Sequence, residues 1–392
     1  MAPISLINRR FIMQDIHDKA TESWQEVHRI LTNRDWISAS LPELLGSSTY
    51  AFCFYKIFGQ KQDALLACHL FEQVALRPEW YSIKVWPAEQ LDYACMAAWL
   101  NARLVVEGLQ VDHVLLAEVD QALGEVAEHV IQHPDTFNRS RFFRILRYFS
   151  LRLPGQQAAH FLQRLLVWFS AAKGDLHKVP VTQTQVSLGL DAGLAAELLV
   201  LIRLHALGLQ NEGLKNLIVK GIIGILALKR NVDFQDGRFA VFPYQVHSQT
   251  EETTFSPTLS WRRGDIGQSL LLYQAHAHLQ EPELAKIAEL VGLNTLLRTT
   301  IKDTGIVSSQ LYDGAAGVAH LYARLYRLSG QDKYQKGQRY WLGQTQSWLR
   351  QELLTGYYQQ RENEVKQGLV GVALVMLSTM TDLDLDWEAA LL

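Results

Sequence analysis

The apolar residues of this chain follow helical spacing over most of its length, and short glycine-containing turns precede several of the apolar runs. The clearest case is Gly-Asp-Ile-Gly at 264–267, followed by Leu-Leu-Leu-Tyr at 270–273. Glycines three residues apart allow a tight turn directly before a first helical turn. The same design occurs at 187–195, 311–319 and 367–374. This recurrence predicts helical repeats that are stacked or closed around a common centre.

The rest of the pattern predicts further helices around this repeat. We expect a polar leading helix at 16–33 that covers the outside, and a polar loop with two prolines at 231–260. A loop of that length inside a compact domain is usually functional or mobile. It contains His247, which is a candidate binding residue. Other helices are expected at 91–101, 194–207, 214–230, 334–354 and 368–380.

Length and composition favour one soluble domain. The 392 residues are 48% hydrophobic, and we expect one domain over 1–392 with 1–35 packed outside the ring. The net charge of −3 argues against nucleic-acid binding. Lys220 and glycines interrupt the apolar stretch 214–228, so stable membrane insertion is not expected. Scattered cysteines and the lack of a signal-peptide pattern at the start favour the cytoplasm.

A basic segment lies between residues 131 and 172. Its arginines fall partly on one helical face, which indicates either a solvated outer face or a docking strip for an acidic segment of a partner. They are Arg139, Arg141, Arg144, Arg147 and Arg152.

Two motifs resemble the lanthionine synthetase C-like (LanC-like) family. Trp-Arg-Arg-Gly-Asp-Ile-Gly at 261–267 is similar to the family's Trp-Cys-Tyr-Gly-Asp-x-Gly, and Tyr-Asp-Gly-Ala-Ala-Gly at 312–317 to its Cys-His-Gly-x-Ala-Gly. The resemblance extends from about residue 40 to the C-terminus, where 384–388 is similar to the family's ending. It implies an all-α fold, an α/α toroid of inner and outer helices with the Gly-x-x-Gly turns at one mouth. It also implies a role in the maturation of ribosomally made, lanthipeptide-type peptides, with a precursor peptide as substrate and a dehydratase as partner.

The resemblance also implies a zinc ion in active members, held by the two cysteines and the histidine of these motifs. Their positions are Arg262, Tyr312 and Asp313 in this chain, and Ala192 replaces a further family histidine. Arginine offers no lone pair, and one phenol with one carboxylate does not make the nitrogen and sulfur site that zinc prefers. We therefore expect no metal ligands and no cofactor. Asp92 is the candidate for a cavity aspartate that the family carries.

The substituted residues suggest what fills this place. We expect Arg262 and Asp313 to pair in the space of the zinc ion, with Asp191 at a neighbouring turn. Asp265 is expected to anchor structure, as a helix cap, rather than to react. The candidate catalytic residues are Arg262, Arg263, Asp313 and Asp191, and the candidate binding residues are Trp261, Asp265, Tyr312 and His247.

Three functions agree with these residues. The first is a zinc-free family member that binds a modified precursor peptide or a partner enzyme, with metal-independent thioether cyclisation open because Arg262 and Arg263 can lower the pKa of a substrate thiol. The second is an acid/base enzyme that uses the carboxylates of Asp191, Asp265 and Asp313. The third is a scaffold for protein interactions that has no catalytic activity.

Overall fold

The computed structural model describes residues 26–32, 36–109, 114–153, 155–172, 185–209, 212–233 and 235–392. Most of the leading helix expected at 16–33 lies outside these residues. Residues 26–32 are helical, and Val27 and Leu31 are fully buried there. His28 Nδ1 lies 2.9 Å from the Tyr50 hydroxyl, which ties this helix to the first helix of the ring.

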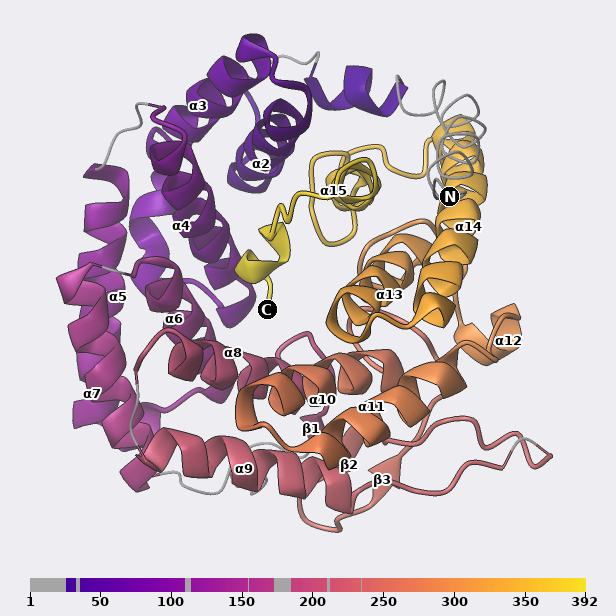
Figure 1. Ribbon diagram of the computed structural model, residues 1–392. Coiled ribbons are helices and arrows are strands. Elements are labelled where there is room, and N and C mark those ends of the chain that lie inside the picture. The colour runs from indigo at the N-terminus through magenta and orange to yellow at the C-terminus, as the bar shows by residue number, and fades with distance from the viewer. Residues whose placement is uncertain are drawn as a thin grey trace, which may run out of the picture.

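The inner helices form a closed ring (Figure 1). Each contacts the next along the chain, and the last contacts the first. In chain order they are α2 (Leu41–Phe58), α4 (Leu91–Val106), α6 (Arg139–Leu151), α8 (Leu194–Ala206), α10 (Asp265–Leu279), α13 (Ala315–Ser329) and α15 (Leu369–Thr379).

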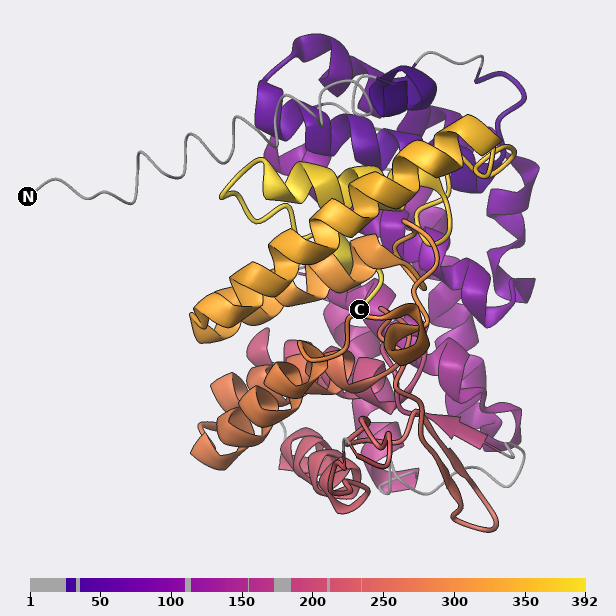
Figure 2. The ribbon, with the colours of Figure 1, turned by 90° about the vertical axis from the view of Figure 1, so that its right-hand side faces the viewer.

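Outer helices surround this ring, most of them packed against an inner partner. Figure 2 shows the pairs α10–α11 and α13–α14 from the side. The outer helices are α3 (Lys61–Ala75), α5 (Val114–Gln132), α7 (Gln156–Ala172), α9 (Glu212–Ala227), α11 (Pro282–Thr295) and α14 (Asp332–Thr355). Short helices lie in the connections: η1 (Pro78–Val85), η2 (Ala88–Gln90), η3 (Pro134–Thr136) and α12 (Ile301–Thr304). A last short helix, η4 (Trp387–Ala390), follows α15.

The sequence explains which helices are inside. The inner α15 is apolar all round and buries each residue from Leu369 to Leu377, as a helix enclosed on all sides must. The outer α14 buries one stripe at three- and four-residue spacing, which includes Tyr334, Trp341 and Leu349. No helix in the described ranges combines the length and apolar character that crossing a membrane requires.

The loop expected at 231–260 contains strands, so the expectation of an irregular segment was wrong. Strand β2 (Gln245–His247) pairs with β3 (Thr253–Thr254) and also with β1 (Gln185–Ser187), all antiparallel. An isolated bridge joins Asp233 to Arg238. The partner strand β1 lies far away in the sequence, and local composition does not reveal such a pairing.

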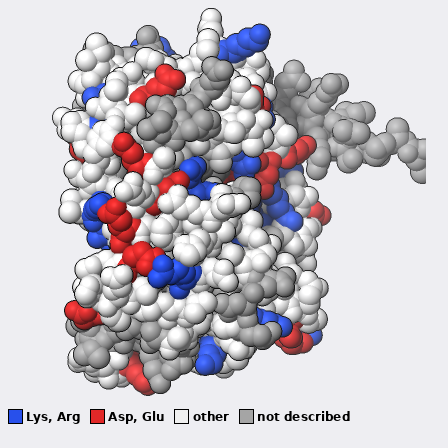
Figure 3. Space-filling view, turned by 90° about the vertical axis from the view of Figure 1, so that its left-hand side faces the viewer, with Lys and Arg blue, Asp and Glu red and all other residues white. Residues whose placement is uncertain are grey.

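The basic segment is neither a solvated face nor a docking strip, because α6 belongs to the inner ring. The side chains of Arg139, Arg144 and Arg147 are at most 8% exposed. Arg139 Nε donates to Glu197 at 2.7 Å, and Arg152 Nη2 donates to Asp120 at 2.7 Å. On the face seen in Figure 3, acidic and basic side chains lie next to one another rather than in a basic patch.

Turns at one end of the inner helices are linked by backbone hydrogen bonds. Leu190 N donates to Arg262 O at 3.0 Å, Trp261 N to Tyr312 O at 2.9 Å, and Tyr312 N to Lys366 O at 3.1 Å. These bonds join the turns before α8, α10, α13 and α15 into one rim, which we call the mouth.

The approach of these turns requires glycine. A Cβ atom on Gly189 would lie 1.8 Å from Arg262 O, and one on Gly371 would lie 1.9 Å from Val365 O.

We expect Gly189→Ala to lower the free energy of unfolding by about 1–3 kcal/mol, because the mouth turns must separate. Urea denaturation measures this. Gly343→Ala is the control: it lies on the exposed side of α14 with nothing near its Cβ, and should raise stability by about 0.5–1 kcal/mol. Equal effects at both positions would contradict the close approach.

The C-terminal segment, residues 384–392, lies in the centre of the ring (Figure 1). Asp386 bonds Arg103 of α4, and the carbonyl oxygen of Ala389 accepts from Arg203 of α8 at 3.1 Å. Trp387 donates to Ser378 at 3.0 Å. The segment therefore ties together inner helices from both halves of the chain.

Glu388 of this segment makes stability depend on pH. Burial alone would raise the pKa of Glu388, but His320 and Arg324 of α13 lower it to about 2, from an ordinary value of 4.5. The stabilisation is therefore complete above the ordinary pKa and is lost as the pH falls toward about 2. We expect the stability difference between the wild type and Glu388→Gln to shrink over that range in urea titrations. Glu283→Gln, in an exposed pair with Lys286, should differ little from the wild type at any pH.

Candidate functional site

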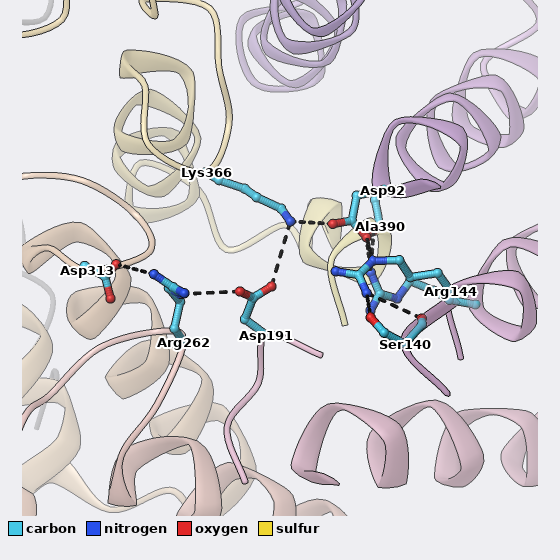
Figure 4. Close-up of polar contacts among 9 residues, drawn as sticks. Asp92, Ser140, Arg144, Asp191, Arg262, Asp313, Lys366 and Ala390 are labelled. Carbon is cyan, nitrogen blue, oxygen red and sulfur yellow. Dashed lines mark hydrogen bonds and ion pairs between the residues drawn. The ribbon is translucent and has the colours of Figure 1, made fainter. Parts of the chain in front are cut away.

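Charged side chains of alternating sign form a chain of ion pairs at the mouth (Figure 4). They come from the turns before α8, α10, α13 and α15, and from α4 and α6. We call this set the mouth cluster, and its members are Asp313, Arg262, Asp191, Lys366, Asp92, Arg144 and Arg147.

The outer end of the cluster centres on Arg262. Its Nη1 donates to Asp313 Oδ2 at 3.0 Å, and its Nε lies 3.3 Å from Asp191 Oδ2. The other oxygen of Asp191 lies 3.8 Å from Lys366 Nζ. One guanidinium group therefore bridges two carboxylates, and an ammonium group continues the chain.

The inner end centres on Asp92, in the first turn of α4. It accepts hydrogen bonds from Lys366, from Arg144 Nε at 2.8 Å and from Arg147 Nη1 at 3.1 Å. Arg147 also donates to Ala390 O at 3.3 Å. The mouth cluster is thereby joined to the C-terminal segment.

Burial increases along the cluster. Asp313 and Arg262 have side chains that are 41% and 33% exposed, whereas Asp92 is 3% exposed. Burial alone would raise the pKa of Asp92, but the charges of Lys366, Arg144 and Arg147 outweigh it and hold the pKa below its ordinary value. Asp92 is therefore ionised at neutral pH.

Lys366 is also held in its charged form. Burial alone would lower its pKa, but Tyr312, Asp92 and Asp191 raise it above the ordinary value. Its Nζ lies 5.0 Å from the centroid of the Tyr312 ring. A lysine with a raised pKa is a poor nucleophile and a poor base at neutral pH.

The predicted catalytic residues separate into two groups. Arg262, Asp191 and Asp313 come together, and the expected Arg262–Asp313 pair is present in the structure. Arg263 turns away from them, with its guanidinium carbon 5.7 Å from the centroid of the Tyr244 ring. Arg263 makes no contact with the mouth cluster.

The predicted binding residues lie in different environments. Trp261 is fully buried, with its ring 5.5 Å from that of His320, and Tyr312 is only 3% exposed. Of the two, Tyr312 reaches the cluster, through Lys366. His247 lies in β2, where its Nδ1 accepts from the backbone of its own turn. The side chains of Trp261 and His247 form no hydrogen bond or ion pair with the mouth cluster.

Asp265 is an anchor, but it does not cap its own helix, so the expected form of the anchor was wrong. Its carboxylate accepts from the backbone N–H groups of Val241 and Phe242, at 3.0 and 2.9 Å, and from Arg298. Asp265 and Arg298 are both fully buried. The pair holds the segment before the mouth turn against α10 and α11.

Sequence reasoning missed Lys366, although a signal for it was present. In four turns, the residue two positions before the glycine at the helix N-cap lies at the mouth. These residues are Asp191, Arg262, Tyr312 and Lys366, ahead of Gly193, Gly264, Gly314 and Gly368. Alignment of the four turns would have identified the lysine.

The residues at the mouth do not fit the zinc ion that the family resemblance implies. Each carboxylate of the cluster is already paired with a cationic side chain, and Arg262 and Lys366 would repel a divalent cation. Among the described residues, no group of three or more histidine, cysteine, aspartate or glutamate side chains is placed to hold a metal.

A small cavity borders the inner end of the cluster. A cavity between α6 and α8 beside Arg144 and Arg147 has a volume of about 10 Å³, which is room for about one water molecule. Arg147 Nε is buried there without a hydrogen-bond partner in the described part of the protein. A ligand of peptide size therefore meets the cluster at its exposed end.

A closed ring of inner and outer helices, with glycine turns gathered at one mouth, defines an α/α toroid. A family model described as "Lanthionine synthetase C-like protein" matches residues 161–392, and the chain belongs to this LanC-like family. The resemblance and the all-α toroid predicted from the sequence are thereby confirmed.

A solved structure titled "Nisin cyclase" is similar to this one. The TM-score is 0.68 at 16% sequence identity, and the alignment covers 97% of each chain. At this identity the likeness shows the fold. No curated protein matches the sequence.

Proposed function

We propose that this LanC-like protein acts in lanthipeptide-type peptide maturation without zinc, and that it binds a modified precursor peptide at the mouth. Family membership supports the pathway. The observation that carries the zinc-free assignment is the pair of cationic side chains, Arg262 and Lys366, interleaved with carboxylates at the mouth. No step of the proposed function runs through a metal.

Binding is favoured over metal-independent cyclisation by the charge balance. Activation of a substrate thiol needs a cation whose charge is available to the thiolate. Arg262 already shares its charge between Asp191 and Asp313, and Lys366 shares its own between Asp191 and Asp92. Their effect on the pKa of a thiol is correspondingly small. The exposed Arg262–Asp313 pair can instead exchange partners with polar groups of a bound peptide.

The same contacts disfavour an acid/base enzyme. Such an enzyme needs a carboxyl group whose pKa is raised, so that it can donate a proton at neutral pH. Asp265 is fully buried with Arg298 and has no path to a substrate. Cationic neighbours hold the pKa of Asp92 low, which removes it as a proton donor.

The test uses the full chain and a labelled synthetic peptide that contains one dehydroalanine and one cysteine. We expect far less than one zinc per protein by elemental analysis, and binding by fluorescence anisotropy that a chelator does not change. Arg262→Met and Lys366→Met should each weaken binding about tenfold, because a hydrogen bond to a charged group contributes about 1.5–3 kcal/mol.

Alkylation followed by mass spectrometry reports whether the peptide thiol stays free. A free thiol after incubation agrees with binding, whereas its loss in the presence of chelator would mean metal-independent cyclisation. Stoichiometric zinc with a chelator-sensitive loss of the thiol would overturn the proposal. A dehydratase from the same gene neighbourhood is the expected partner, and co-purification tests that association.

A further inference from the structure

We propose that a groove on the outer wall, between α5 and α7, binds an extended basic segment of a peptide. This inference rests on the proposed peptide-binding function and adds a second contact region away from the mouth. The C-terminal segment and the mouth cluster take up space at the centre of the ring, and the outer wall offers a second surface for the remainder of a bound peptide.

The groove has the size of a ligand site. Its volume is about 370 Å³, within the range from about 300 to 1,000 Å³ that is common for ligand pockets. Its lining on α5 extends from Gln121 to Gln132, a helix length of about 16 Å at 1.5 Å per residue. That length matches about five residues of an extended peptide at 3.3 Å each.

A glycine shapes the floor of the groove. A Cβ atom on Gly124 would lie 2.4 Å from the ring of Phe161, so the absence of a side chain lets this ring lie against α5. The ring is held from below by Phe149, with the centroids 5.2 Å apart. Phe161 therefore presents a fixed apolar surface to the groove, and the face of such a ring also attracts Lys and Arg side chains.

The polar lining is acidic and amide-bearing. Glu125 and Glu128 line the groove together with His129 and with Gln121, Gln132 and Gln157, and no lysine or arginine is among the lining residues. The side chains of Gln132 and Gln157 make no hydrogen bond within the described ranges. A glutamine amide carries both a donor and an acceptor, and so can pair with a peptide group.

The carboxylates are accessible to a ligand because their present partners are exposed. Glu125 pairs with Lys84 at about half exposure of both side chains. Glu128 pairs with Arg164 at 2.5 Å, and that arginine is 45% exposed. Exposed ion pairs contribute little to stability, so a lysine or arginine of a peptide can replace either partner at little cost. An acidic occupant finds no lysine or arginine among the lining residues, so the lining favours a basic occupant.

The experiment compares two fluorescein-labelled peptides by anisotropy on the full chain, one alternating lysine with leucine and the other glutamate with leucine. We expect the lysine peptide to bind more tightly. Glu125→Lys combined with Glu128→Lys should weaken its binding at least about tenfold, since two charge-assisted contacts become repulsive. Phe161→Ala should weaken binding of both peptides.

Glu118→Lys is the matched control for each single reversal, Glu125→Lys or Glu128→Lys, because it makes the same charge change on an exposed position of α5 outside the lining. Its effect should stay below about twofold. An equal loss of peptide binding in Glu118→Lys, or unchanged peptide binding in the double variant, would overturn the proposal that the groove binds the peptide. Circular dichroism checks that each variant is folded.

Lys366→Met separates this inference from the proposed function. The lysine peptide should bind this variant as it binds the wild type. If the groove variants bind the lysine peptide as the wild type does, while binding of the dehydroalanine peptide still depends on Lys366, the groove proposal is wrong and the mouth proposal stands. If the groove variants weaken binding but the dehydroalanine peptide never binds, the groove stands and the mouth proposal fails.

Discussion

Asp265→Ala is expected to lower the free energy of unfolding by about 3–5 kcal/mol, because it leaves Arg298 charged and unpaired in a fully buried position. It also removes the acceptor of two backbone N–H groups, those of Val241 and Phe242. Urea denaturation followed by circular dichroism measures the loss of stability. A reduced yield of folded protein would agree with the same prediction.

The control for this prediction is Asp233→Ala. Asp233 also pairs with an arginine, Arg238, at 3.0 Å, but both side chains are at least 39% exposed. Its loss should lower the free energy of unfolding far less than the loss of Asp265 does. Adding Arg298→Met to Asp265→Ala should recover part of the lost stability, since the buried charge is then gone. Similar costs for Asp265 and Asp233 would show that burial does not control these pairs.

Asp92→Ala is expected to lower the free energy of unfolding by a similar amount, about 3–5 kcal/mol. It leaves the buried guanidinium groups of Arg144 and Arg147 without their carboxylate partner. Lys366 loses its hydrogen-bonded partner at the same time. Asp313→Ala, at the exposed end of the same cluster, should cost less than about 1 kcal/mol.

The two variants are compared in the same urea experiment. A small effect of Asp92→Ala would mean that water reaches its partners, and would contradict the burial of the inner end of the cluster. A cost for Asp313→Ala as large as that for Asp92→Ala would instead place the centre of the network at the exposed end.

Much of the fold follows from the sequence because its signals are local. The glycine turns and the apolar runs after them are visible in short windows, and they mark the starts of α10, α13 and α15. The pair of Arg262 and Asp313 also follows, since both stand at equivalent turns. The pairing of strand β1 with β2 was missed because it joins segments about sixty residues apart, and the residues of neither segment identify the other as its partner.

The arginines of α6 show a signal that was present but misread. Spacing alone placed Arg144 and Arg147 on an outer face. Most positions around them carry large apolar residues, among them Phe142, Ile145 and Phe149, so the helix is buried on every side. Charged residues in such a helix must find partners inside the protein. The partner of these arginines, Asp92, is determined by tertiary packing, and the spacing of the arginines does not identify it.

The contact between α15 and α2 has a consequence for synthesis of the chain. Helix α2 leaves the ribosome long before its ring neighbour α15, because most of the described helices lie between them in the sequence. During that interval the inward surfaces of the early helices have no permanent cover, and exposed apolar surface of this kind promotes aggregation. The protein should therefore depend on chaperones until α15 has been synthesised, and its folding should be slow for a helical protein because closure of the ring joins distant parts of the sequence.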